Sequence, residues 1–349
     1  TLSIMSIILK LLKDQKKFNK LFLFLSKFEE NFFSIEKIKI QEPVFICGMA
    51  RSGTTFLTHL LDSSNNFSTF KYKSLPFYKI PIFWNYINSI FYLSKKKKQR
   101  LHGDNLKVSI ESPDSFEELI WKNNIENYEN AGYWQTIDVH KSQILSKNLK
   151  KFIQKTIHID KKQRYLSKNN NNIFRIKYLL NQFPDAKIIV VIRNPIDLAF
   201  SSAKVHFKFL KYHEKIKDFS DELTELGHYE FGNQRRMFNL NNELNTSNNI
   251  RFKTTKLYLN KFIELLDYIL KNYSSEIHKK KIIIFNYDNL KKFDDLAKLL
   301  QFLNVENDLD LENYFNNNFL IKGQKRKINE LKKKINFDLF NEISKHSII

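Results

Sequence analysis

The feature that most constrains the fold is an apolar run followed by a glycine-bounded loop and a helix start, over residues 43–61. Val44 to Cys47 form an uninterrupted apolar run that is typical of a buried strand, and Gly48 follows it. The loop ends at Gly53, after which apolar residues recur at helical spacing. A helix that starts in such a loop directs its free backbone N–H groups, and the positive end of its dipole, at one place. The segment therefore predicts an anion site, most often one for phosphate.

This loop differs from the loops of nucleotide triphosphatases at one position. Its glycines have the spacing of a P-loop, but Thr54 stands where those enzymes carry the lysine that serves the β- and γ-phosphates. The missing lysine argues against ATP or GTP chemistry and favours a different phosphorylated donor.

A second strand–turn–helix junction lies at residues 187–202. Residues 187–192 read as a strand, Arg193 turns out of it, and a proline opens the next helix. Arg193 at the strand end and Ser201 two turns into the helix could bind one phosphate from two sides. Arg193 by itself would more often be a surface arginine that caps a strand, and a loop of the first kind can also be a turn without a ligand. The two motifs in this order, each at a strand-to-helix junction, favour a shared ligand site.

Together the two segments resemble the sulfotransferase superfamily, of the bacterial or protein- and glycan-modifying type, which uses 3′-phosphoadenosine 5′-phosphosulfate (PAPS). In that family a loop of the type RSGTT binds the 5′-phosphosulfate, and an arginine followed eight residues later by a serine binds the 3′-phosphate. The resemblance implies that the donor is bound by Arg51, Ser52, Gly53, Thr54, Thr55, Arg193 and Ser201.

The resemblance covers most of residues 41–325 and reaches further positions. Residues 164–170 look like the family's strand and lysine-bearing turn, which implies that Lys168 helps to stabilise the leaving phosphate. Near the C-terminus a short glycine-containing basic stretch is similar to the family's loop over the 3′-phosphate, which implies roles there for Lys325 and Arg326.

The general base is the point at which the sequence departs from the family. Related enzymes carry a catalytic glutamate shortly after the first helix, and Ser74 occupies that position here. The nearest replacements are His102 and Glu117, in a block that resembles a stretch of the bacterial relatives. An imidazole titrates near neutral pH, and burial can tune a carboxylate for the same task. Two other interpretations stay open: Glu117 is only a first-turn carboxylate favoured by the helix dipole, or the activity is lost or altered.

Alternating strand and helix patterns predict an α/β fold with a P-loop-type parallel sheet flanked by helices. We expect an amphipathic helical segment over residues 1–40 and a single sulfotransferase domain over 41–349, with a helical insertion at about 72–160. Residues 221–275 read as helical, and residues 304–318 read as polar and loop-rich.

Composition bears on partners and on location. The 58 lysines and arginines against 37 acidic residues give a formal net charge of +21, which suits an anionic ligand but also follows from a general bias toward lysine. Arginines are few and no nucleic-acid-binding motif is present, which argues against nucleic acid as a partner. The N-terminal amphipathic pattern allows contact with a membrane surface. A single cysteine excludes an intrachain disulfide, so a cytoplasmic location is expected.

We therefore expect a sulfotransferase that moves the sulfuryl group of PAPS, in line, to an acceptor hydroxyl on a glycan, lipid, small molecule or protein tyrosine. No metal is expected, because the sequence holds no clustered histidine, cysteine and carboxylate ligands. The alternatives are a P-loop kinase of a nucleotide or small molecule, and a non-catalytic anion- or nucleic-acid-binding protein on the same scaffold. The sequence leaves the acceptor and the oligomeric state open.

Overall fold

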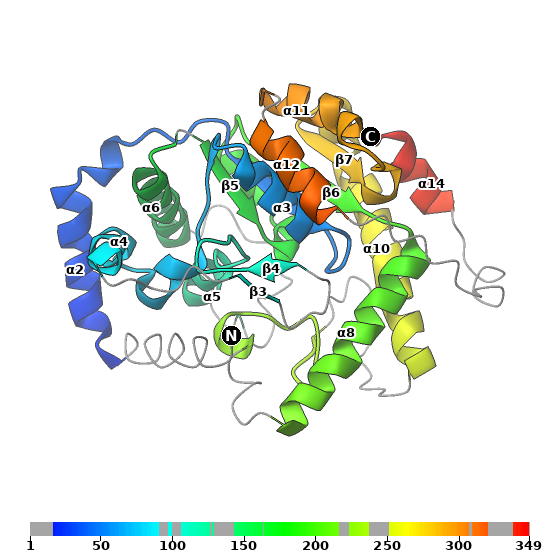
Figure 1. The fold of residues 1–349 in the computed structure, drawn as a ribbon, viewed down its shortest axis with the longest axis horizontal. Coiled ribbons are helices and arrows are strands. Elements are labelled where there is room, and N and C mark those ends of the chain that lie inside the picture. Colours follow the sequence, from blue (N-terminus) through cyan, green and yellow to red (C-terminus); the bar gives the residue numbers. More distant parts are fainter. Residues whose placement is uncertain are drawn as a thin grey trace.

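A parallel five-stranded sheet in the order β2-β5-β1-β6-β7 forms the centre of the molecule (Figure 1). The computed structural model describes residues 17–90, 97–99, 106–125, 128, 143–162, 164–215, 223–236, 251–306, 309–319 and 338–348. The strands of the sheet are β1 (Val44–Cys47), β2 (Phe67–Ser68), β5 (Arg164–Lys168), β6 (Lys187–Ile192) and β7 (Ile282–Asn286). A separate antiparallel pair is formed by β3 (Lys98–Gln99) and β4 (Lys107–Val108).

Helices cover both faces of the sheet. They are α2 (Asn19–Phe32), α3 (Thr54–Ser63), α4 (Pro81–Ile90), α5 (Glu118–Asn124), α6 (Gln143–Asp160), α7 (Ile176–Gln182), α8 (Pro195–Lys215), α10 (Arg251–His278), α11 (Ala297–Leu303), α12 (Leu309–Asn318) and α14 (Asp338–Lys345). Between β2 and β5 the chain runs through the 3₁₀ turn η2 (Tyr72–Phe77), α4, the small β-pair, α5 and α6. None of the helices within the described residues is both long and apolar enough to cross a membrane.

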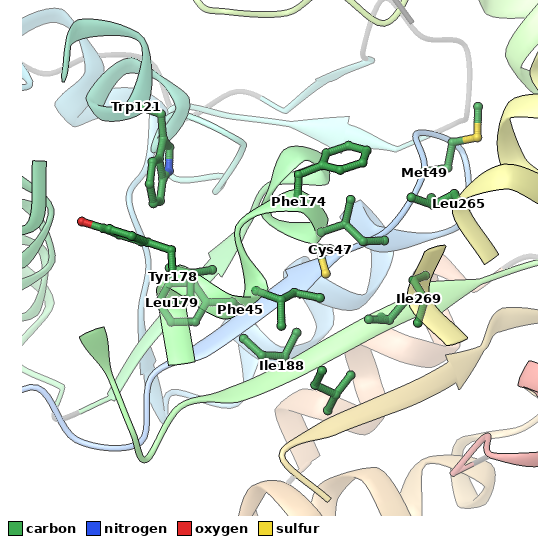
Figure 2. Packing of buried hydrophobic residues seen from close by; sticks show 14 of the residues in the cluster. Phe45, Cys47, Met49, Trp121, Phe174, Tyr178, Leu179, Ile188, Leu265 and Ile269 are labelled. Carbon is green, nitrogen blue, oxygen red and sulfur yellow. The ribbon is translucent and has the colours of Figure 1, made fainter. Parts of the chain in front are cut away.

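The central strand explains why the sheet is buried on both sides. Val44 and Ile46 of β1 pack in one hydrophobic cluster with residues of α3, α11 and α12. Phe45 and Cys47 point to the opposite face and pack with residues of α7, α8 and α10 (Figure 2). A strand that is covered on both faces needs apolar residues at every position, which is why its sequence is a continuous apolar run. The predicted fold class, a parallel sheet flanked by helices, is confirmed.

The strand order fixes where a ligand can bind. β5 lies on one side of β1 and β6 lies on the other, with both pairs parallel. The chain leaves β1 toward β2, beyond β5, and leaves β6 toward β7 on the other side. The connections that leave β1 and β6 therefore diverge at the carboxyl ends of these strands, which is the place where open α/β sheets bind ligands.

Two segments differ from their prediction. Residues 226–236 are not helical: they form turns, in which Gly227 and Gly232 adopt φ values of 76° and 84°. Residues 309–318, predicted as loop, form helix α12, because Leu311 and Phe315 lie one turn apart and both are buried. In the first segment two glycines break the apolar periodicity, and in the second a short apolar stripe is hidden among asparagines.

Candidate functional site

The loop after β1 has the geometry of an anion site. At Gly48 (φ 148°) a Cβ atom would lie 2.5 Å from the carbonyl oxygen of Val191, so the strand of β6 passes too close for any side chain. At Gly53 (φ 110°) a Cβ atom would lie 2.4 Å from the ring of Tyr287. Helix α3 begins at the next residue, so its first N–H groups face the loop. Arg51, between the glycines, has a φ of 77°, a strained conformation for a residue with a side chain.

The structure brings the two predicted motifs together. Arg51 donates a hydrogen bond from Nε to Ser201 Oγ of α8 at 3.1 Å. Arg193 donates from Nη1 to the carbonyl oxygen of Arg51 at 3.4 Å. Residues separated by about 150 positions in the chain thus share one corner, at the carboxyl ends of β1 and β6.

Donor groups remain unused in this corner. Ser52 Oγ and Arg193 Nε are buried and have no hydrogen-bond partner among the described residues. Arg193 lies over the ring of Tyr287, with 5.6 Å to the ring centroid, and its Nε is 3.8 Å from Asp288 Oδ1. Burial raises the pKa of the Asp288 carboxyl, against the N–H of Asn194 and the charge of Arg193, which lower it. Free donors and an arginine within one buried corner fit an anionic ligand.

A pocket opens beside the loop on its β5 side. Its lining includes Arg51, Thr54 and Thr55 from the loop and the start of α3, and Lys168 from the end of β5. Register explains the place of Lys168, because it pairs with Ile46 of β1, close to the strand end at which the loop begins. Lys168 is 8 % exposed, and its ammonium donates to Ser115 Oγ at 2.7 Å, so the side chain is held at the pocket in a fixed position.

Glu117 has no access to this pocket. Its Oε1 accepts hydrogen bonds from Trp121 Nε1 at 2.9 Å and Asn172 Nδ2 at 3.3 Å. Its Oε2 accepts from the hydroxyl of Tyr165 at 2.9 Å. Glu117 is 2 % exposed, and its hydrogen bonds link the start of α5 to β5. This role is structural, and the buried carboxylate is not accessible to a substrate.

The other predicted positions divide into two groups. Ser74 is buried in η2, so the position at which related enzymes carry glutamate faces the interior. His102, Lys325 and Arg326 lie outside the described residues.

Two residues at the pocket were missed by the sequence analysis. His228 and Glu230 also line the pocket, each with 23 % of its side chain exposed. Glu230 Oε1 accepts a hydrogen bond from Asn170 Nδ2 at 3.2 Å. The signal that could have found them is the stretch Gly227 to Gly232, in which two of the seven glycines of the chain enclose a histidine and a glutamate.

Groups of metal-binding side chains do not gather at this site. Within the described part of the chain, no three histidine, cysteine, aspartate or glutamate residues lie together in a way that could hold a metal ion.

Comparisons with known proteins show the family to which the chain is similar. Residues 43–254 match the sequence profile described as "Sulfotransferase family". The omega-hydroxy-beta-dihydromenaquinone-9 sulfotransferases Stf3 of Mycobacterium bovis and Mycobacterium tuberculosis are 26 % identical over 194 residues, which are 51 % of this chain and 48 % of theirs. The chain thus matches about half the length of these curated relatives.

Solved structures show a similar fold. Sulfotransferase STF9 from Mycobacterium avium aligns with 92 % of this chain and 80 % of its own, with a TM-score of 0.53 and 12 % identity. Sulfotransferase STF1 from Mycobacterium tuberculosis H37Rv aligns with 95 % of this chain and 90 % of its own, with a TM-score of 0.50 and 12 % identity. At this identity the likeness is one of fold.

Proposed function

This chain belongs to the sulfotransferase family, and on that premise we propose that it transfers the sulfuryl group of PAPS to the hydroxyl of an apolar acceptor. The observation that carries the proposal is the junction of the two motifs, where Arg51 bonds to Ser201 and Arg193 bonds to the backbone of Arg51. A nucleotide that carries phosphate at both its 3′ and 5′ positions needs two anion sites at a fixed separation. In the proposal, the loop and the corner around Arg193 serve as these two sites.

In this proposal each end of the donor meets its own set of groups. The N–H groups at the start of α3, with the hydroxyls of Thr54 and Thr55, bind the 5′-phosphosulfate. Arg193 and Ser201 bind the 3′-phosphate. Arginine suits this task because its guanidinium group presents parallel donors that match the oxygens of a phosphate.

PAPS supplies an activated sulfuryl group on a phosphate leaving group. The chain has to meet the negative charge that grows on the leaving oxygen, and to hold the acceptor hydroxyl in line with it. The proposal gives the first task to Lys168, and the hydrogen bond that holds its ammonium at Ser115, beside the loop, supports it. Loss of one such preorganised donor typically lowers the rate by about 10²–10³-fold.

The acceptor class is proposed from a second pocket that adjoins the first. The two pockets share Ala50, Asn170, Glu230 and Phe231 in their lining. The second is mainly apolar, and its lining includes Met49, Phe174 and Leu265, which Figure 2 shows around the end of β1. An alcohol with a hydrocarbon or aromatic body could place that body in the apolar pocket and its hydroxyl beside the loop. The two curated relatives are named for a menaquinone derivative, which supports this class.

We also propose that helix α2 binds the surface of an anionic membrane, which would bring such acceptors within reach. Exposed apolar side chains extend along the helix and the residue before it, and they are Phe18, Leu21, Leu23, Phe24, Phe28 and Phe32. Its acidic residues face inward, because Glu29 and Glu30 are buried and form ion pairs with lysines of α6. Lys20 and Lys27 are exposed, so the outward surface of the helix is apolar and basic. That combination is typical of helices that lie on anionic bilayers.

The donor proposal is tested by calorimetric titration with 3′-phosphoadenosine 5′-phosphate, and with ATP in parallel, without magnesium. We expect the bisphosphate to bind and ATP to bind far more weakly. The reverse preference would favour the kinase alternative, and absence of binding by either nucleotide would refute the proposed function.

The membrane proposal is tested by co-sedimentation with vesicles of phosphatidylglycerol and phosphatidylcholine. We expect the wild type to sediment with them and the double variant Phe24→Asp/Phe28→Asp to stay in solution. Ile144→Asp is the matched control, because Ile144 is a 74 % exposed apolar residue on a different helix. Equal sedimentation of the double variant, or a wild-type dimer that the double variant loses, would contradict docking on lipid.

A further inference from the structure

The groups around Glu230 point to a general base, an assignment that rests on the proposed function. We propose that His228 accepts the proton of the acceptor hydroxyl, and that Glu230 and Asn170 position it. His228 would then perform the task that glutamate performs at the Ser74 position in related enzymes.

A continuous series of contacts leads from the donor loop to His228. Thr54 Oγ1 of α3 donates to Asn170 Oδ1 at 3.4 Å. Asn170 Nδ2 donates to Glu230 Oε1 at 3.2 Å, which leaves Oε2 for a second partner. That oxygen lies 3.8 Å from Nδ1 of His228. The series ties the imidazole to the residue at which the donor loop becomes helix.

The chemistry of an imidazole selects His228 over Glu230 as the base. Histidine changes its charge between pH 5 and 8, and it is the most frequent general base in enzymes for that reason. A carboxylate that faces one ring nitrogen orients the ring and leaves the other nitrogen for the substrate. Here Nδ1 faces Glu230, so Nε2 is the nitrogen that is left for a hydroxyl in the pocket. Distances in such pairs are often long before the substrate binds and shorten in the complex.

The backbone on both sides of His228 is fixed by buried groups. At Gly227, with its φ of 76°, a Cβ atom would lie 2.7 Å from Cγ of Glu118, so the chain rests directly on that side chain. Glu118 in turn accepts two hydrogen bonds from Arg175, at 2.9 and 2.7 Å. Beyond His228, the carbonyl oxygen of Glu230 accepts from the hydroxyl of Tyr258 at 2.9 Å. A base that is held in this way needs little reorganisation to act.

Sulfuryl transfer with these groups forms one bond to sulfur, breaks another and moves one proton. A bond forms between the acceptor oxygen and sulfur while the bond between sulfur and the 5′-phosphate oxygen breaks. The electron pair of the broken bond stays on the phosphate oxygen, where Lys168 and the loop N–H groups meet the charge. The acceptor proton moves to Nε2 of His228, and the carboxylate of Glu230 faces the imidazolium that results.

The test compares two acceptors that differ in their need for a base. Benzyl alcohol keeps its proton at neutral pH, whereas p-nitrophenol is largely ionised at pH 8 and needs no base. With radiolabelled PAPS we expect His228→Gln to lower transfer to benzyl alcohol by about 10²–10⁴-fold and to leave transfer to p-nitrophenol nearly unchanged. Glu230→Gln should have a smaller effect of the same kind. His278→Gln, at an exposed histidine near the end of α10, is the matched control.

Binding of 3′-phosphoadenosine 5′-phosphate, measured by calorimetry, provides a readout that does not depend on turnover. We expect the affinity of His228→Gln to equal that of the wild type. Equal losses with both acceptors, unchanged transfer to benzyl alcohol, or a wild type that binds the bisphosphate and transfers to neither acceptor would each overturn the assignment. A wild type that fails to bind the bisphosphate would instead overturn the proposed function.

Discussion

Replacement of Arg193 by alanine tests the proposed site for the 3′-phosphate. The guanidinium group of Arg193 is only lightly used within the protein: its bond to the Arg51 carbonyl oxygen is 3.4 Å long, and its Nε is 3.8 Å from Asp288. Most of its donor capacity is therefore available to a ligand. Hydrogen bonds that involve a charged group contribute about 1.5–3 kcal/mol, which corresponds to a loss of about 10- to 150-fold in affinity for the bisphosphate.

A second ligand separates loss of a phosphate contact from damage to the fold. Adenosine 5′-phosphate lacks the 3′-phosphate, so Arg193→Ala should leave its affinity unchanged. The variant should then favour the bisphosphate over adenosine 5′-phosphate by a much smaller factor than the wild type does, with Ser201 as the remaining contact to the 3′-phosphate. The difference between the two ligands in the two proteins is a coupling energy, which assigns the interaction to this pair of groups.

The assay is calorimetry of both nucleotides with the wild type and three variants. Arg193→Lys keeps the charge but loses the parallel donors, so its affinity for the bisphosphate should be intermediate. Lys204→Ala removes an exposed cation from α8 and is the control for a general loss of positive charge. If Arg193→Ala weakens both nucleotides by the same factor, Arg193 does not contact the 3′-phosphate and the reasoning is refuted.

Three further predictions follow from buried contacts. Gly53→Ala should weaken bisphosphate binding in calorimetry, because the added Cβ would lie 2.4 Å from the ring of Tyr287. Adding Tyr287→Ala should restore binding in part, and full binding by Gly53→Ala alone would contradict this packing. Arg175→Leu should lower the free energy of unfolding in urea by about 3–5 kcal/mol, because it leaves Glu118 charged and buried, and adding Glu118→Gln should recover part of that loss. Burial and the charge of Arg235 lower the pKa of His206 from 6.5 to about 3. The contribution of the neutral imidazole to the free energy of unfolding is therefore fully present above pH 6.5 and declines as the pH falls toward 3. Urea unfolding between pH 7 and 5 should therefore show a steeper loss of stability in the wild type than in His206→Asn.

The strand, loop and helix start over residues 43–61 could be predicted from sequence because their geometry is local. Val44 to Cys47, the loop and the start of α3 form one continuous segment, and its glycines are needed where the backbone leaves a strand and enters a helix. The structure shows additional reasons for these glycines that sequence could not give. Gly48 lies close to the carbonyl oxygen of Val191, and Gly53 packs against the ring of Tyr287, the residue that follows β7.

The side of the pocket that His228 and Glu230 form could not be predicted, because distant parts of the chain determine the position of these residues. Residues 226–236 show no periodicity, and their conformation depends on Glu118 beneath Gly227 and on the imidazole of His206. The backbone N–H of Gly232 donates to His206 Nδ1 at 3.1 Å, a contact that requires the ring to be neutral there. Glu117 illustrates the converse, because a carboxylate at a promising sequence position is fully used by Trp121 and by groups of other elements.

The donor loop and the segment that carries His228 are held by different kinds of contact, and this difference bears on which acceptor can bind. The donor loop lies between β1 and α3 and is constrained by close backbone contacts, so few residues can change there without loss of the anion site. The segment that carries His228 is held by side chains of α5, α8 and α10, and the apolar pocket beside it is lined by Phe174, Phe231 and Leu265. Substitution among apolar residues of similar volume at these positions should change which alcohol fits, at a cost in stability of less than about 1.5 kcal/mol. Phe174, Phe231 and Leu265 lie outside the donor loop, so such substitutions should leave the proposed donor site in place, although Gly48, Met49 and Ala50 of the loop also line the apolar pocket.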